Sequence, residues 1–439
     1  MSDAKQHSPT RRAVLGGTAA VGAGALLAPG ALADTATTGA GAGTGRRGVD
    51  RAAVDAVAAR LDDELVALRR DIHRHPEGPG EERRTAALVA DRLGAAGLAV
   101  TTGVGGHGVV GVLRGHCPGR TVGYRADMDA VPPSGQLSGG ATGPAHVCGH
   151  DLHTTIGVGV AEVLARLRHR LSGTVVFLFQ PAEETLSGAR AMLADGVLDA
   201  GPARPEEIHA LHCGPFPVGR FAVTPGTGLP GQDHGSVTLS GPDAADQAQR
   251  LAAELAALAT VTEPETSADL ERLVTDWQTP DGPLTRFVAF RAAAGEGAEA
   301  GTVSLGYRCW PEERYVEVRE AIRETAARYA GARVDLADEP FPAMVCPAEL
   351  GHVAERHLRR VLGPDGVTVL HAALPFAGED FTFFLDRMPG TFTFLGVRAP
   401  GADIATSFPH FGAFDPDERA IGHGVRAMAG WLATRAGRD

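Results

Sequence analysis

Residues 175–184 read Val175-Val176-Phe177-Leu178-Phe179-Gln180-Pro181-Ala182-Glu183-Glu184, an apolar run followed by a polar turn with two adjacent glutamates. A short apolar run bounded by proline is typical of a buried strand. Similar runs lie upstream at residues 109–113 and 121–125, and helical periodicity occurs at residues 154–168 and 187–193. Strands that alternate with helices indicate an α/β sheet, in which ligands bind at the carboxyl ends of the strands.

The chain before this stretch is predicted to be helical. Apolar residues recur at three- and four-residue steps from Val54 to Ile72, with Asp50 as a plausible N-cap and Pro76 beyond the end. This pattern predicts an amphipathic helix. A second helix is expected over residues 82–96.

The pattern changes after Pro225. The sequence there predicts two helices, at residues 244–259 and 313–329, and two short strands, at residues 286–291 and 302–308. Helix and strand alternate again after Pro342, at residues 350–362 and 391–397. We therefore expect an α/β domain (residues 49–225 and 342–439) interrupted by a smaller α+β domain (residues 226–341).

The N-terminus has the pattern of an export signal. Thr10-Arg11-Arg12-Ala13-Val14-Leu15 contains twin arginines, an apolar Gly/Ala-rich stretch follows, and Ala31-Leu32-Ala33 is a small-residue cleavage site. Residues 1–33 are therefore predicted to be a twin-arginine signal peptide and residues 34–48 a flexible linker. This predicts a secreted protein with no stable membrane span after processing. The alternative is a basic N-terminus before a disordered linker.

Composition excludes several classes of function. The net charge of −12 argues against nucleic acid as a partner, because nucleic-acid binders need a basic face. Lys5 is the only lysine, so Schiff-base chemistry and a P-loop lysine are excluded once the signal is removed. The 5 cysteines are widely spaced and odd in number, which gives no evident disulfide framework.

Polar clusters occur where the predicted strands end or helices begin. They are residues 125–129, 148–154, 180–184, 211–213 and 409–411. Cys148 offers a thiolate, the histidines offer imidazole and Glu183-Glu184 offers carboxylates, which are the usual ligands of zinc and its divalent neighbours. One glutamate of the pair could bind metal while the other transfers protons, and Asp129 could orient a ligand. Each element alone is more often structural, but together they favour a metal site.

Five stretches resemble the M20 metallopeptidase family, in its amidohydrolase branch of aminoacylase, hippurate hydrolase and indole-acetyl-amino-acid hydrolase type. They are Leu68-Arg69-Arg70-Asp71-Ile72-His73-Arg74-His75-Pro76-Glu77, Arg125-Ala126-Asp127-Met128-Asp129-Ala130, Cys148-Gly149-His150-Asp151, Phe179-Gln180-Pro181-Ala182-Glu183-Glu184 and Gly378-Glu379-Asp380-Phe381. The resemblance runs from about residue 60 to the C-terminus and is weakest between residues 226 and 341. It implies a zinc-peptidase-like catalytic domain, with a central mixed sheet flanked by helices. An inserted α+β, ferredoxin-like lid domain is implied as well.

The resemblance also implies roles for single residues. The implied ligands of two divalent metal ions (zinc, manganese, cobalt or nickel) are Cys148 in the bridging position, His150, Glu184, His212 and His410. Glu183 matches the general base and Asp129 an orienting carboxylate. The implied reaction is metal-dependent hydrolysis of an N-acyl amino acid or a related small amide, by a protein that can form homodimers through the inserted domain.

The sequence departs from the family pattern in the inserted domain. Residues 238–245 lack the histidine of the family's Gly-Gly-His-Ala segment, and residues 295–300 replace its Asn-Val-Ile-Pro segment. His234 and Arg291 are candidates to compensate in substrate binding. Three hypotheses stay open: a working secreted amidohydrolase, a catalytically degenerate metal-binding homologue, and a dipeptidase or carboxypeptidase. Without lysine, a substrate carboxylate must be bound by an arginine, with Arg286, Arg291 and Arg308 as candidates.

Overall fold

The computed structural model describes residues 48–137 and 141–437. The predicted signal peptide, nearly all of the linker and Lys5 lie outside the described residues. No helix among the described residues combines the length and the apolar character that crossing a bilayer requires.

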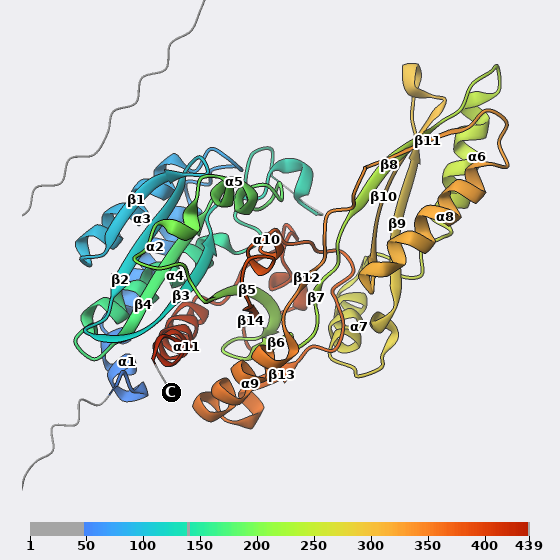
Figure 1. The fold of residues 1–439 in the computed structure, drawn as a ribbon. Helices are drawn as coiled ribbons and strands as arrows, with labels where there is room; N and C mark the ends of the chain where they lie inside the picture. Colours follow the sequence, from blue (N-terminus) through green and yellow to red (C-terminus); the bar gives the residue numbers. More distant parts are fainter. Residues whose placement is uncertain (1–47, 138–140, 438–439) are drawn as a thin grey trace, which may run out of the picture. The chain divides into compact units, whose positions relative to one another are not determined.

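A mixed sheet of eight strands organises residues 99–398 (Figure 1). Its strands are β1 (Ala99–Val104), β2 (Gly108–Arg114), β3 (Cys117–Asp127), β4 (Ser172–Gln180), β5 (Glu207–Pro217), β6 (Phe221–Val223), β13 (Val367–Val369) and β14 (Gly390–Arg398), in the spatial order β1-β2-β4-β3-β5-β14-β6-β13. Strands β4, β3, β5 and β14 run parallel to one another. Their carboxyl ends therefore meet at one edge of the sheet.

Helices cover both faces of this sheet, which explains the continuous apolar run in β4. Val175, Phe177 and Phe179 belong to one hydrophobic cluster, whereas Val176 and Leu178 belong to another. The first cluster includes side chains from α1 (Arg51–Ala58), α2 (Asp62–His73), α3 (Arg83–Ala95), α4 (His150–Arg166), α9 (Ala348–Leu362) and α11 (Arg419–Ala436). The second includes side chains from α5 (Gly188–Ala194), α7 (Ser267–Trp277) and α10 (Thr382–Leu385).

Two predictions about this part of the chain are wrong. Residues 54–72 do not form one helix, because the chain makes a tight turn after α1, in which the Leu61 amide bonds to the Ala58 carbonyl at 2.8 Å, and restarts as α2. His212 does not follow the end of a strand. It lies within β5, which continues because His212 pairs with Phe394 of β14.

A second sheet of four antiparallel strands lies within residues 233–336. Its strands are β8 (Asp233–Thr238), β9 (Phe287–Ala294), β10 (Thr302–Trp310) and β11 (Arg333–Leu336), in the order β11-β8-β10-β9. Helices α6 (Ala244–Ala256) and α8 (Tyr315–Ala326) share a hydrophobic cluster with it. Apart from α7, the chain order β8-α6-β9-β10-α8-β11 is that of a ferredoxin-like unit. The short strands β7 (Gly228–Leu229) and β12 (Met344–Val345) pair separately.

Helix α7 is an addition that the sequence analysis did not anticipate. Its residue Trp277 is fully buried, its indole nitrogen donates to the Ala372 carbonyl at 2.9 Å, and its ring packs edge-on against Phe394 of β14. This helix thus comes from the predicted insertion but packs into the core of the first sheet. We therefore keep the domain limits at residues 225 and 341 as a proposal.

Candidate metal centre

The predicted metal ligands come from the start of α4, the end of β4, the middle of β5 and the loop after β14. Cys148 lies two residues before α4, and His150 is the first residue of that helix. Glu184 follows β4, and His212 comes from β5. His410 comes from the loop between β14 and α11.

The five residues form two triplets that share Cys148. One consists of Cys148, His150 and His212, and the other of Cys148, Glu184 and His410, with the ligand atoms of each triplet within 4.8 Å of one another. The Cys148 sulfur lies 3.4 Å from His212 Nε2. Glu184 Oε1 lies 3.7 Å from His150 Nε2, and Glu184 Oε2 lies 3.5 Å from His410 Nε2. Each triplet could hold one divalent cation, with Cys148 contributing to both sites.

Hydrogen bonds fix the orientation of all three histidines. In each ring Nδ1 faces an oxygen: that of Cys213 for His212 (2.8 Å) and that of Gly135 for His410 (2.9 Å). His150 Nδ1 lies 2.9 Å from the Asp129 carbonyl and 3.2 Å from its carboxylate. With the proton on Nδ1, each Nε2 presents a lone pair to the cluster, which is the usual tautomer of a metal-bound histidine held by an oxygen.

Two buried ligand atoms have no hydrogen-bond partner within the described chain. They are His150 Nε2 and Glu184 Oε1, which face each other. Leaving buried polar atoms unpaired costs about 1–3 kcal/mol each, so they need a partner between them. A divalent cation satisfies both, and the donor set of thiolate, imidazole and carboxylate fits zinc or a neighbouring metal.

His153 is close to the cluster, but both of its ring nitrogens already have hydrogen-bond partners. Its Nδ1 lies 2.6 Å from Asp127, and its Nε2 accepts the Cys213 amide at 2.8 Å. Asp127 is also paired with the buried Arg125. The neighbouring group of Asp127, His150 and His153 is therefore better explained as a hydrogen-bonded support under the ligands.

The predicted catalytic residues lie beside the ligands. Glu183 Oε2 is 3.8 Å from His150 Nε2. Burial raises the pKa of Glu183 well above its ordinary value, and Glu379 raises it further. Asp129 bonds to His150 and also accepts the Glu184 amide at 2.9 Å, so one carboxylate orients two ligands.

The side chains around the predicted metal ligands carry more negative than positive charge. Burial raises the pKa of Glu379 to about 8, although Arg125 opposes the shift. Burial lowers the pKa of His150, but Asp127 and the hydrogen bond from Asp129 outweigh it and bring the value to about 10. Metal bound at His150 would therefore displace the proton that this ring holds in the metal-free site.

Left-handed backbone conformations occur around the ligands. Ala182, Leu186 and His410 have φ angles of 52°, 53° and 70°, which are uncommon for residues other than glycine. Gly149, between two ligands, has a φ of 97°, and a Cβ there would lie 2.7 Å from the Cys213 sulfur.

A cavity of about 480 Å³, here called the metal cavity, opens on the cluster. Cys148, Glu183, Glu184, His212 and His410 line it. Arg291 and Arg308 line it as well, whereas Arg286 is exposed and paired with Glu317 at 2.9 Å. His234 is exposed and is not among the residues that line the cavity, so the structure does not bring it to the site.

Trp277 lines the metal cavity and was missed by the sequence analysis. A signal for its helix is present: Leu270, Val274 and Trp277 recur at helical spacing, and Thr266 and Asp269 form a capping box. Its contact with β14 depends on tertiary packing, which periodicity alone does not predict.

Comparisons with known proteins identify the family and the fold. Residues 123–434 match the model of peptidase family M20/M25/M40. The probable hydrolase sll0100 of Synechocystis sp. is 31% identical over 392 residues, which cover 85% of this chain and 96% of the relative. N-acetyldiaminopimelate deacetylase of Enterococcus faecalis is 30% identical over 390 residues, which cover 84% and 97%. The solved YXEP protein of Bacillus subtilis, described as a dinuclear metal binding peptidase from the M20 family, has a TM-score of 0.63 and 26% identity, with 86% and 98% covered.

Proposed function

This chain belongs to peptidase family M20/M25/M40 and is a hydrolase that acts on amide bonds; we propose that it cleaves N-acyl amino acids. The observation that carries the proposal is the pair of ligand triplets around Cys148, with Glu183 beside them. A catalytically degenerate binding protein would not need a buried proton acceptor next to the ligands. The dipeptidase hypothesis differs only in the substrate.

Glu183 is the residue proposed to transfer the proton. Two divalent cations held by the triplets would supply a water of lowered pKa and a polarised amide carbonyl. Glu183 takes the proton of the attacking water and then delivers it to the nitrogen of the leaving amine. Burial raises the pKa of Glu183 well above its ordinary value, which strengthens the carboxylate as a proton acceptor.

Arg308 is the proposed contact for the substrate's carboxylate. Its guanidinium donates to the Ala377 carbonyl at 3.0 Å and to Gln232 Oε1 at 2.7 Å. Among the described residues, no carboxylate lies within ion-pair distance of it, although it is largely shielded from solvent. A shielded cation without a counter-ion favours an anionic ligand, and its planar fork suits a carboxylate.

Secretion and assembly are part of the same proposal. The twin arginines at Arg11 and Arg12 support export of the folded, metal-loaded protein. A homodimer through residues 226–341 is proposed by resemblance alone. Fractionation of cells that express wild-type protein or a variant with both arginines replaced by glutamine tests export. Equal secretion of the two forms would count against the twin-arginine route.

The reaction is tested with Glu183→Ala. We expect hydrolysis of N-acetyl and N-benzoyl amino acids to fall by about 10²–10⁴-fold, because the proton acceptor is lost. Bound metal, measured by elemental analysis, should stay at the wild-type content, because the five ligands are intact. Retained activity in this variant would exclude the proposed role of Glu183. A wild-type protein that is inactive with zinc, manganese, cobalt and nickel would exclude the proposed reaction.

A further inference from the structure

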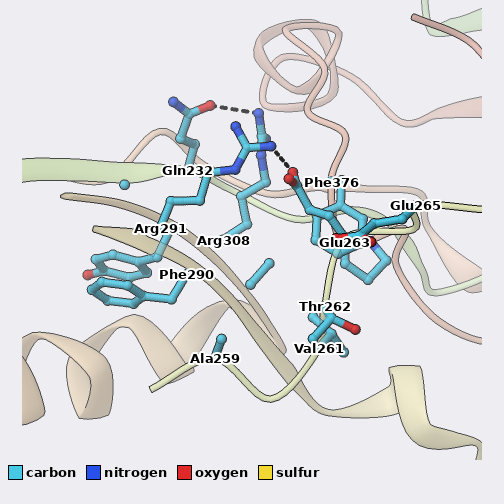
Figure 2. A pocket seen from close by; sticks show the side chains of 14 residues that line it. Gln232, Ala259, Val261, Thr262, Glu263, Glu265, Phe290, Arg291, Arg308 and Phe376 are labelled. Carbon is cyan, nitrogen blue, oxygen red and sulfur yellow. Dashed lines mark hydrogen bonds and ion pairs between the residues drawn. The ribbon is translucent and has the colours of Figure 1, made fainter. Parts of the chain in front are cut away.

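A second cavity of about 540 Å³, here called the side cavity, adjoins the metal cavity (Figure 2). The two cavities share five lining residues: Gln232, Glu263, Arg291, Arg308 and Phe376. None of the five predicted metal ligands lines the side cavity. It is therefore placed to receive a part of the substrate that does not react.

Two arginines, Arg291 and Arg308, line both cavities. In Figure 2 the guanidinium groups of Arg291 and Arg308 lie next to each other, with Arg308 bonded to Gln232 and Arg291 paired with Glu263. Burial lowers the pKa of Arg308 to about 10; Glu183 opposes this shift and Arg291 adds to it. Glu263 is paired with Arg291 and not with Arg308, so the two guanidinium groups can accept further negative charge.

The pair between Arg291 and Glu263 is weak enough to exchange. The side chains are 70% and 46% exposed, and exposed ion pairs contribute about 0–1 kcal/mol. A carboxylate on a substrate that is already held at Arg308 has a high effective concentration at Arg291. Such a group can therefore replace Glu263 at small cost.

The remaining walls suit a short carbon chain. Val261, Phe290 and Phe376 are apolar, and Phe290 stacks on Tyr307 with ring centroids 5.3 Å apart. The Tyr307 hydroxyl is already bonded to Asp233 and is not free for a ligand. The other polar side chains of the lining are those of Gln232, Thr262, Glu263 and Glu265, so Arg291 and Arg308 are the cationic groups among the residues that line this cavity.

We propose that Arg291 and the side cavity form a subsite for a second carboxylate, on the amine half of the substrate, and that Glu263 occupies this subsite in its absence. The inference rests on the proposed function and narrows it to acylated dicarboxylic amino acids. The α-carboxylate lies at Arg308 and the side-chain carboxylate at Arg291.

The test uses two substrates of nearly equal shape, N-benzoyl-glutamate and N-benzoyl-glutamine, with the metal-loaded full chain. We expect wild type to prefer the glutamate compound by about tenfold or more in kcat/KM, which corresponds to about 1.4 kcal/mol. Arg291→Gln should bring the ratio close to one, and Glu263→Gln should increase it by lowering KM for the glutamate compound. Arg286→Gln, a matched surface change, should leave the ratio as in wild type. An equal ratio in wild type and Arg291→Gln would overturn the proposal.

Calorimetry separates this inference from the proposed function. Glutarate should bind the chelator-treated wild-type protein and bind at least about tenfold more weakly to Arg291→Gln. If glutarate binding depends on Arg291 but neither amide is hydrolysed, the proposed reaction fails and the subsite stands. If both amides are hydrolysed but neither glutarate affinity nor the kinetic ratio depends on Arg291, the subsite is excluded.

Discussion

The contacts that support the metal ligands are buried, whereas the ion pair between Arg291 and Glu263 at the side cavity is largely exposed. Asp129 and His150 are fully buried; Asp129 bonds to His150 and to the Glu184 amide, and His150 Nε2 faces Glu184. In the side cavity, Arg291 and Glu263 are 70% and 46% exposed and hold each other alone. A buried hydrogen-bond network tolerates little change, because a polar group that loses its partner there is left without either a hydrogen bond or water. Exposed pairs exchange partners cheaply, so the reaction is fixed in one region while selectivity can vary in the other.

The largest effect is expected from loss of the shared ligand. Cys148→Ser should remove both triplets at once and lower bound metal together with kcat/KM. The loss should exceed the roughly 10–100-fold that changes in residues supporting a ligand typically cause. Cys117→Ser, at a half-buried thiol outside the cluster, is the matched control for elemental analysis and kinetics. If Cys148→Ser kept the full content of two ions, the thiolate would not bridge them.

A smaller effect is expected when only the support is changed. Asp129→Asn keeps the shape of the side chain but weakens its hydrogen bonds to His150 and to the Glu184 amide. Metal affinity, measured by competition with a chelator, should fall by about 10–100-fold. Asp386→Asn, on an exposed carboxylate, is the control. Wild-type affinity in Asp129→Asn would mean that burial alone orients the ligands, and the contrast with the exposed Arg291–Glu263 pair would lose its basis.

A third effect is expected on folding stability rather than on metal binding or turnover, and it concerns how the free energy of unfolding depends on pH. The pKa of Glu379 in the folded chain is raised to about 8, so the folded metal-free protein binds an extra proton between the ordinary pKa of glutamate and that value. Its free energy of unfolding should therefore fall as pH rises from 5 to 8, by up to about 1.4 kcal/mol per pH unit for one proton. Urea denaturation of wild type and Glu379→Gln checks this, and the variant should show a flatter slope.

The second sheet should respond to pH in the opposite sense. Arg319 and Tyr307 lower the pKa of Asp233, although burial opposes them. The stabilisation from Asp233 is present above the ordinary pKa of aspartate and is lost as pH falls through the lowered value. A metal-free protein whose stability is constant from pH 5 to 8 would contradict the assignment for Glu379 and leave this acid-side loss unaffected.

Local pattern was enough to predict much of the first sheet and its helices. The apolar run of β4 and the polar turn after it could be read from the sequence because a strand buried on both faces needs continuous apolar residues. Gly149 and the residues beside it could be placed at a helix start for similar local reasons. The structure brings Cys148, His150, Glu184, His212 and His410 together, while their roles as ligands stay predictions.

Long-range packing is what the sequence did not disclose. Trp277 lines the metal cavity because α7 packs on β14. Glu263, in the loop before α7, pairs with Arg291 of β9. Neither contact follows from periodicity. His234 was suggested by its nearness in sequence to the altered segment, but on β8 its side chain is exposed. Position along a chain is a poor guide to position in a site when the intervening residues form a sheet of their own.

The left-handed conformations at Ala182, Leu186 and His410 have a consequence for engineering. A residue with a side chain loses roughly 1–2 kcal/mol in this conformation, so the turn around the glutamate pair and the loop of the fifth ligand are sources of instability. Glycine at Leu186 would relieve this local strain and also loosen the turn. Variants selected for heat resistance alone are therefore expected to lose the left-handed conformations of the turn that holds Glu183. A screen for stability should select for catalytic turnover at the same time.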